Sequence, residues 1–136
     1  MIIHTSALIA ILTCEDGSAA LIEALGIENG IVPAPVILEF LRVARGERIG
    51  LASQAEALLD RLVRYGHATA AFTAEHATLA AEAEKRYGKG NGRGGLLNLL
   101  DLMVYAVAKE RGEPLLCTGK DFAATDLDLH AASRPF

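Results

Sequence analysis

Short apolar runs alternate along the chain with longer stretches in which apolar residues recur at helical spacing. The apolar runs predict buried strands at 1–5, 30–35, 67–72 and 113–118, and an edge strand at 127–132. The stretches between them predict helices at about 7–12, 18–26, 35–47, 51–65, 74–87 and 97–111. Because strands and helices alternate, we expect an α/β fold with a parallel sheet covered by helices on both faces.

Local signals mark where several of these helices begin. The tripeptide at 16–18 is a typical N-cap cluster, Pro35 suits a first helical turn, and Thr73 is placed as a cap. The loop "GKGNGRGG" at 88–95 holds five glycines and two basic residues, which predicts an exposed and mobile connection. The stretch 97–111 is almost entirely apolar, so we expect this helix to be central and buried.

Composition narrows the class of protein. The 136 residues suit one domain spanning 1–136, and a hydrophobic content of 51% without tryptophan predicts an aliphatic core. No apolar run reaches the ~18 residues of a membrane span, and no positively charged segment precedes the first apolar run. We therefore expect a cytoplasmic protein with Cys14 and Cys117 as buried free thiols. The formal charge of −4 does not indicate nucleic-acid binding, although a local basic strip would permit it.

Acidic residues fall where strands give way to helices. Glu39 lies one turn into an apolar helix, and Asp101 is the only charge in the early turns of the most apolar helix. Asp121 follows the strand at 113–118, with Asp126 shortly after it. In a doubly wound sheet these acids converge with His4, at the end of the first strand, on the carboxyl edge. Clustered carboxylates are tolerated mainly around a cation, and oxygen ligands suit Mg²⁺ or Mn²⁺.

Each acid also has a structural interpretation. Asn98 and Asp101 have the spacing of a helix capping box, and so do Thr118 and Asp121. Glu39 is spaced to pair with Arg42, three residues further along the same helix. The remaining histidines show no ligand spacing and are expected at the surface; they are His67, His76 and His130. Spacing alone therefore leaves the metal-binding and structural interpretations both open.

The ordered motifs resemble those of PIN-domain ribonucleases, in particular VapC-like toxins of toxin–antitoxin pairs. The opening "MIIHTSALIAIL" resembles the family's first strand, which usually ends in Asp, and "APVILEF" resembles its second acidic motif. The segments "LNLLDLMVYAVA" and "TGKDF" resemble the third and fourth motifs. By this resemblance Glu39, Asp101 and Asp121 are catalytic and metal-binding acids, with Asp126 a second candidate for the fourth.

The resemblance implies a fold and an activity. It implies a three-layer α/β/α sandwich with a parallel sheet of four or five strands, and a metal-activated water that cleaves RNA of the tRNA or rRNA class. It also implies a homodimer and a small VapB-like antitoxin. Thr5 and Ser6 are implied to support metal or phosphate binding. Basic residues near the glycine loop, Lys89 and Arg93 among them, are candidates to contact RNA, which would make binding sensitive to salt.

Departures from the family pattern concentrate at the site. His4 stands in the place of the first catalytic Asp, Leu99-Leu100 replaces the common Phe-Gly, and Lys120 stands where Asp or Asn is common. Because a neutral imidazole is a poor substitute for a carboxylate on Mg²⁺, we predict little or no Mg²⁺-dependent cleavage. His4 then reflects an engineered or selected inactivation, a naturally degraded toxin, or a shift toward Mn²⁺ or another transition metal.

Two other functions fit parts of the pattern. One is a catalytically dead PIN homologue that still dimerises and binds an antitoxin. The other is a phospho-acceptor signalling domain, which would use a strand-end lysine such as Lys120. That function needs a phosphorylatable Asp at the end of a central strand, and the strand at 67–72 provides none.

Overall fold

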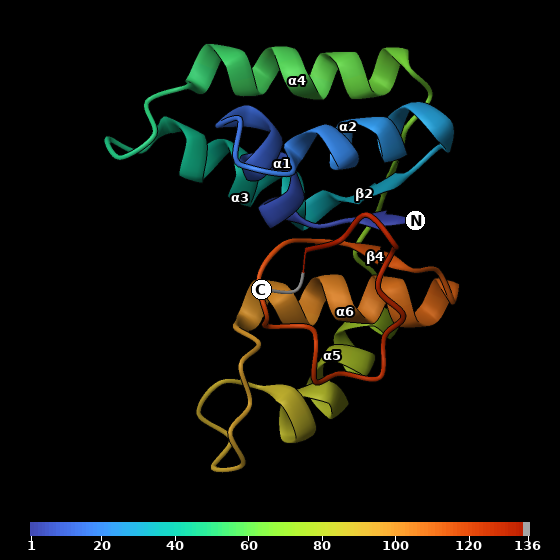
Figure 1. Ribbon diagram of the computed structural model, residues 1–136. Helices are drawn as coiled ribbons and strands as arrows, with labels where there is room; N and C mark the ends of the chain where they lie inside the picture. The colour runs from blue at the N-terminus through green and yellow to red at the C-terminus, as the bar shows by residue number, and fades with distance from the viewer. Residues whose placement is uncertain (135–136) are drawn as a thin grey trace.

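Within residues 1–134, four parallel strands form one sheet in the order β3-β2-β1-β4. Figure 1 shows this sheet between two layers of helices. The computed structural model describes residues 1–134. The strands are β1 (Ile2–Ile3), β2 (Ile31–Pro33), β3 (Ala68–Ala70) and β4 (Leu115–Leu116). Ile2 in the central strand pairs with Ile31 on one side and Leu115 on the other. The strand order reverses between β1 and β4, which is where open α/β sheets bind their ligands.

Six helices cover the two faces of this sheet. They are α1 (Thr5–Leu12), α2 (Ser18–Ile27), α3 (Ala34–Arg45), α4 (Ala52–Arg64), α5 (Ala74–Tyr87) and α6 (Leu99–Arg111). Figure 1 shows α1 to α4 on one face of the sheet and α5 and α6 on the other. This arrangement confirms the expected three-layer α/β fold, because each parallel crossover must return the chain over one face. Within residues 1–134, no helix is long and apolar enough to cross a membrane.

The helix signals read from the sequence act as expected. Pro35 lies in the first turn of α3, and the Thr73 side chain accepts a hydrogen bond from the amide of His76 at the start of α5. Helix α6 is the most buried helix, with seven buried residues out of 13. It packs against α5 and α3 and therefore holds the position of its first turn firmly.

The expected edge strand at 127–132 is wrong. Leu129 makes a single parallel bridge to Leu115, with the Leu115 amide donating to Asp128 and the His130 amide donating back to Leu115. The amide of Ser133 then donates to the carbonyl of His130, which makes a turn, and beyond it a second isolated bridge pairs Arg134 with Thr118. A ladder cannot continue through a turn, so residues 127–132 contribute a single bridge.

Two histidines expected at the surface are buried instead. His67 and His76 are only 6% and 4% exposed. Each is held by a backbone amide that donates to Nδ1, from Gly30 at 2.8 Å for His67 and from Thr73 at 3.0 Å for His76. Burial lowers the pKa of His67. Neutral imidazole can therefore serve as a buried acceptor, a role that the spacing of histidines along a sequence does not reveal.

Only one of the two cysteines shows the expected burial. Cys117 is buried at the end of β4, and burial raises the pKa of its thiol to about 11. Cys14 is exposed, because it follows the end of α1 in a left-handed backbone conformation with φ of 54°. Both are free thiols, as expected.

Candidate active site

His4 lies at the end of β1 and caps helix α1. Its backbone is extended, and its Nδ1 accepts a hydrogen bond of 3.1 Å from the amide of Ser6. An imidazole thus does the work that a short oxygen-bearing side chain usually does at this position. Because Nδ1 accepts from an amide, the neutral ring carries its hydrogen on Nε2.

Nε2 of His4 faces Asp101 in the first turn of α6. It donates to Oδ1 of Asp101 across 2.9 Å, and the two residues are 7% and 4% exposed. The other carboxylate oxygen, Oδ2, accepts from the amide of Asn98, while Asn98 Oδ1 accepts from the amide of Asp101. The capping box expected from the sequence is therefore present. Both oxygens of Asp101 are engaged with protein donors.

Ser6 extends this arrangement to the last strand. Its Oγ lies 2.8 Å from His4 Nδ1 and accepts a hydrogen bond of 2.9 Å from the amide of Thr118. The ring of Phe122 packs edge-to-face on His4, with centroids 5.0 Å apart. We refer to His4, Ser6, Asn98, Asp101 and the Thr118 amide as the His4 network. It joins β1, β4 and α6 at the point where the strand order reverses.

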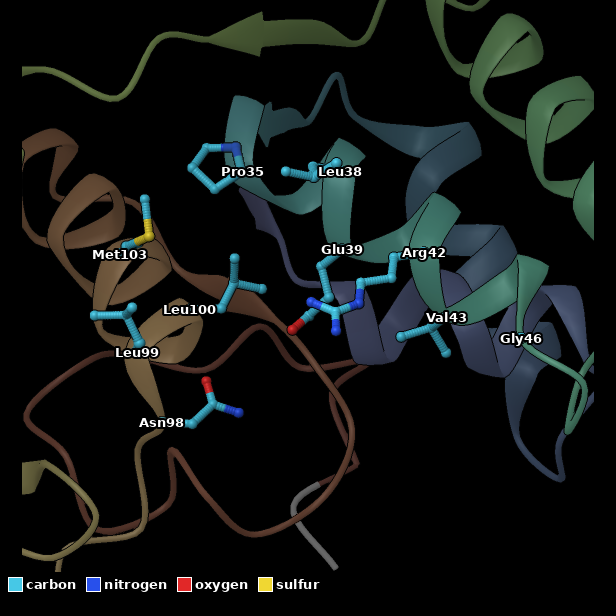
Figure 2. Close-up of a pocket in the computed structure, with 10 residues that line it drawn as sticks. All are labelled: Pro35, Leu38, Glu39, Arg42, Val43, Gly46, Asn98, Leu99, Leu100 and Met103. Atoms are coloured by element: carbon cyan, nitrogen blue, oxygen red, sulfur yellow. The ribbon is translucent and has the colours of Figure 1, made fainter.

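The other acids are not part of this network. Glu39 is half-buried on α3 and lines a groove of about 630 Å³ that ends beside Asn98 at the start of α6 (Figure 2). Asp121 is exposed and lines a separate hollow of about 210 Å³ beside Arg93. Within residues 1–134, no three His, Cys, Asp or Glu side chains are placed together so as to hold a metal ion.

Asp126 has partners away from the site. Its carboxylate accepts from the hydroxyl of Tyr105 and from the ammonium of Lys109, each at 2.7 Å. The Lys109 hydrogen bond, followed by that from Tyr105, lowers the pKa of Asp126. This acid ties the segment after β4 to the outer turns of α6.

The remaining structural interpretations do not hold. The amide and hydroxyl of Thr118 both bond to Ser6, so Thr118 forms no capping box with Asp121. Among residues 1–134, Glu39 has no ion-pair partner, although Arg42 lines the same groove. The groove is mostly apolar, and Leu38 and Leu99 on its walls are 71% and 74% exposed.

Three further residues of the site differ in how clearly the sequence indicated them. Asn98 was indicated by its capping spacing with Asp101. Phe122 was marked only as the last residue of the "TGKDF" motif, and its contact with His4 arises from the turn after β4. The hydroxyl of Thr5, the residue between His4 and Ser6, is buried without a hydrogen-bond partner among residues 1–134.

Comparisons with known proteins agree with this architecture. Residues 1–127 match the family profile described as PIN domain. Ribonuclease VapC42 of Mycobacterium tuberculosis is 40% identical over 129 residues, covering 93% of this chain and 96% of that protein. Ribonuclease VapC of Mycolicibacterium smegmatis is 38% identical over 132 residues, covering 93% and 97%.

Solved structures show the same fold at lower identity. VapC20 of Mycobacterium tuberculosis, described as a sarcin-ricin loop cleaving toxin, has a TM-score of 0.73 at 17% identity and covers 93% of this chain and 95% of its own. A toxin–antitoxin complex from Klebsiella pneumoniae has a TM-score of 0.69 at 15% identity, covering 99% and 97%. With the sheet order, the site position and the two sequence relatives, these findings show that the chain belongs to the PIN domain family, as a relative of the VapC ribonucleases.

Proposed function

We propose that this chain is a VapC-like toxin whose RNA-cleaving activity is attenuated or absent because His4 stands where the family has its first acid. The observation that supports this is the hydrogen bond from His4 Nε2 to Asp101. A family nuclease of this kind depends on Mg²⁺ or Mn²⁺ held by acids, here Glu39, Asp101 and Asp121. Asp126 is the weaker fourth candidate, because Tyr105 and Lys109 occupy its oxygens.

The residues present do not fit a Mg²⁺ ion. Mg²⁺ prefers oxygen ligands in near-ideal octahedral geometry, and the first ligand position here presents an N–H group instead. That N–H is bonded to Oδ1 of Asp101, an oxygen that a cation would otherwise use. The second oxygen of Asp101 is held by the Asn98 amide. The charge of the carboxylate is thus stabilised by hydrogen bonds from the protein.

The transition-metal account of His4 is weakened by the same geometry. A ligating imidazole must offer an unprotonated nitrogen to the metal. Here Nδ1 accepts from the Ser6 amide, which leaves the hydrogen on Nε2 toward Asp101. To free Nε2, the hydrogen would have to move to Nδ1, where it would oppose the Ser6 amide.

The substrate and partners follow from the same proposal. The RNA belongs to the tRNA or rRNA class and is met in the cytoplasm. Lys89 and Arg93 contact the backbone of the RNA. Ser6 belongs to the site through the His4 network, and Thr5, whose hydroxyl is buried, supports the turn that carries Ser6. A VapB-like antitoxin and a second copy of the chain are the protein partners. Two similar solved structures are toxin–antitoxin complexes, which supports the first of these.

A catalytically dead homologue that only binds antitoxin is the second candidate function. The same His4 network favours it, since both ring nitrogens of His4 and both carboxylate oxygens of Asp101 are bonded without a ligand. On this alternative, restoring the acid would not restore cleavage, because the rest of the site would have drifted as well. The departures at Leu99 and Lys120 would then be part of that loss.

The substitution His4→Asp separates these two functions. We expect the Asp variant to cleave total cellular RNA with Mg²⁺ or Mn²⁺ while the wild-type chain does not, read as new fragments on a denaturing gel. His4→Asn is the matched control, because Asn also caps helices but adds no charge. If the Asp variant leaves all RNA intact with either ion, the nuclease proposal fails and the antitoxin-binding function remains.

A further inference from the structure

We infer that the loop at 88–95 is a preformed binding site for the phosphates of single-stranded RNA and that Asn91 is the residue that positions it. This inference rests on the proposed function for the identity of its ligand. The loop projects away from the sheet beyond the end of α5 (Figure 1). The inference is drawn from the two cations of the loop and from its internal hydrogen bonds.

Asn91 organises the loop through its side chain. Its Oδ1 accepts from the amide of Arg93 at 2.8 Å and from the amide of Gly95 at 3.2 Å. Its Nδ2 donates to the carbonyl of Lys85 in the last turn of α5, at 3.2 Å. One side chain therefore ties the middle of the loop to its end and to the preceding helix.

The base of the loop is closed by backbone hydrogen bonds. The amide of Lys89 donates to Leu97, and the amide of Leu97 donates to Tyr87, at 2.7 and 2.9 Å. Leu97 directly precedes Asn98, the cap of α6. The loop is therefore fastened beside the helix that carries Asp101, at the carboxyl edge of the sheet.

Alternating glycines give the loop its shape. Gly90, Gly92 and Gly94 all have positive φ, between 75° and 87°, which other residues rarely adopt. Their three amides have no acceptor within residues 1–134. They alternate along the loop with the amides of Asn91, Arg93 and Gly95, which are bonded within the loop. Backbone amides left free in a turn can bind anions.

The cations of the loop are also free. Lys89 and Arg93 are exposed, and among residues 1–134 neither has an ion-pair partner. By contrast, Lys85 on α5 is paired with Glu82 at 3.1 Å. A fold that leaves two cations unpaired beside three free amides presents donors that match the oxygens of a phosphodiester.

The adjoining hollow favours RNA over an acidic protein surface. It lies between the loop and the segment after β4 and is lined by Arg86, Arg93 and Asp121. The Arg86 guanidinium stands 5.0 Å from the centre of the Tyr87 ring, so a planar cation and an aromatic ring border the same hollow. Such surfaces stack unpaired bases, a contact that an acidic side chain cannot use. RNA held by the loop would run toward the His4 network.

The test measures RNA binding by the chain as it exists. A fluorescein-labelled single-stranded oligoribonucleotide of mixed sequence is titrated at several salt concentrations and followed by anisotropy. We expect Lys89→Gln/Arg93→Gln to weaken binding at least tenfold and to reduce the salt slope by about 1.4, at about 0.7 per phosphate contact. Arg64→Gln/Arg111→Gln removes the same charge from two exposed, unpaired arginines elsewhere and should change affinity less than twofold.

Asn91→Ala tests the positioning role at constant charge. We expect roughly fivefold weaker binding, a shallower salt slope, and faster hydrogen exchange at the amides of Arg93 and Gly95. Introduced into the Lys89→Gln/Arg93→Gln chain, Asn91→Ala should weaken binding less than twofold, because two of the groups it positions are already gone and only the loop amides remain. A role limited to general stability would lower affinity equally in both backgrounds.

Three results would overturn the inference. They are unchanged affinity in Asn91→Ala, equal losses in the two double variants, and competition by polyglutamate as effective as competition by RNA. The outcome stays separate from that of the cleavage test. If the RNA binding depends on the loop but the His4→Asp variant does not cleave RNA, only the nuclease proposal is contradicted. If the His4→Asp variant cleaves RNA equally well with and without the loop substitutions, only this inference is contradicted.

Discussion

The His4 network and the 88–95 loop treat their polar groups in opposite ways. In the network, His4, Ser6 and Asp101 are each bonded to another protein group, and His4 and Asp101 are buried. In the loop, Lys89 and Arg93 are exposed and unpaired within residues 1–134, although the backbone that carries them is held by Asn91. Groups satisfied inside the protein stabilise it, whereas groups left free on a held frame remain available to a ligand.

This difference reverses the expectation raised by the family pattern. At the edge of the sheet where the family pattern has its first acid, His4 is hydrogen-bonded to Asp101 and to the Ser6 amide. The feature that looks least structured in the sequence, a run of glycines, is the one that presents unsatisfied donors. The proposed cleavage and the proposed RNA binding therefore depend on different regions of the chain, and substitutions in the two regions should have different kinds of effect.

The largest effect on stability should come from replacing His4, which bonds Asp101 within the His4 network. His4→Asp places a second carboxylate beside buried Asp101, and we expect a loss of about 1–3 kcal/mol in unfolding free energy without metal. Mg²⁺ or Mn²⁺ at 100 times its Kd should then restore ~2.7 kcal/mol. Thermal melting with chelator and with each ion measures both changes. The wild-type Tm should not respond to either ion, and an equal response in the two proteins would contradict a closed site.

A loss of stability of the same order, without a response to metal ions, should follow from disturbing the acceptor of the network. Asp101→Asn keeps one oxygen but turns the other into an amide donor, which must face either His4 Nε2 or the Asn98 amide. We expect a cost of about 1–3 kcal/mol, measured by urea unfolding. Asp121→Asn is the control; being exposed, it should change stability by less than about 0.5 kcal/mol. Similar costs in both variants would mean that Asp101 is no more deeply engaged than Asp121.

The smallest effect concerns Asp126. Like the residues of the His4 network it is hydrogen-bonded, and like the cations of the loop it is exposed. Its pKa is lowered in the folded state by Lys109 and Tyr105, from an ordinary value of 3.8. Its contribution to stability is therefore present above pH 3.8 and is lost as the pH falls from 3.8 through the folded-state pKa. Urea unfolding of Asp126→Asn across this range should show a weaker acid decline than wild type. An identical decline would assign the pH dependence to other carboxylates.

Most of the fold could be predicted because it depends on local patterns. Short apolar runs located the strands and apolar residues at helical spacing located the helices, while Thr73 and Asn98 marked two helix starts by their own hydrogen-bonding chemistry. The expected strand at 127–132 was wrong because pairing depends on where the chain turns, here at His130 and Ser133. Such a turn does not alter the alternation of apolar residues.

The site was predictable only in part. That His4 and Asp101 belong together follows from the parallel sheet, which brings the end of β1 and the start of α6 to one edge. That Asp126 instead bonds Tyr105 and Lys109 could not be predicted, since those contacts span 21 and 17 residues and depend on the path of the chain after β4. The buried acceptor roles of His67 and His76 were hidden for the same reason.

Sequence patterns were sufficient to establish the alternating fold, the family motifs and the substitution of a histidine for the first acid, because each is a property of residue type and spacing. Only the folded chain decided what that histidine does. Its ring nitrogens are assigned by a neighbouring amide and a carboxylate 97 residues away, and hydrogen bonds between such distant groups exist only once packing has brought them together. Likewise, five glycines predict a conformationally free loop. The Asn91 side chain, through its three hydrogen bonds, gives this loop one conformation.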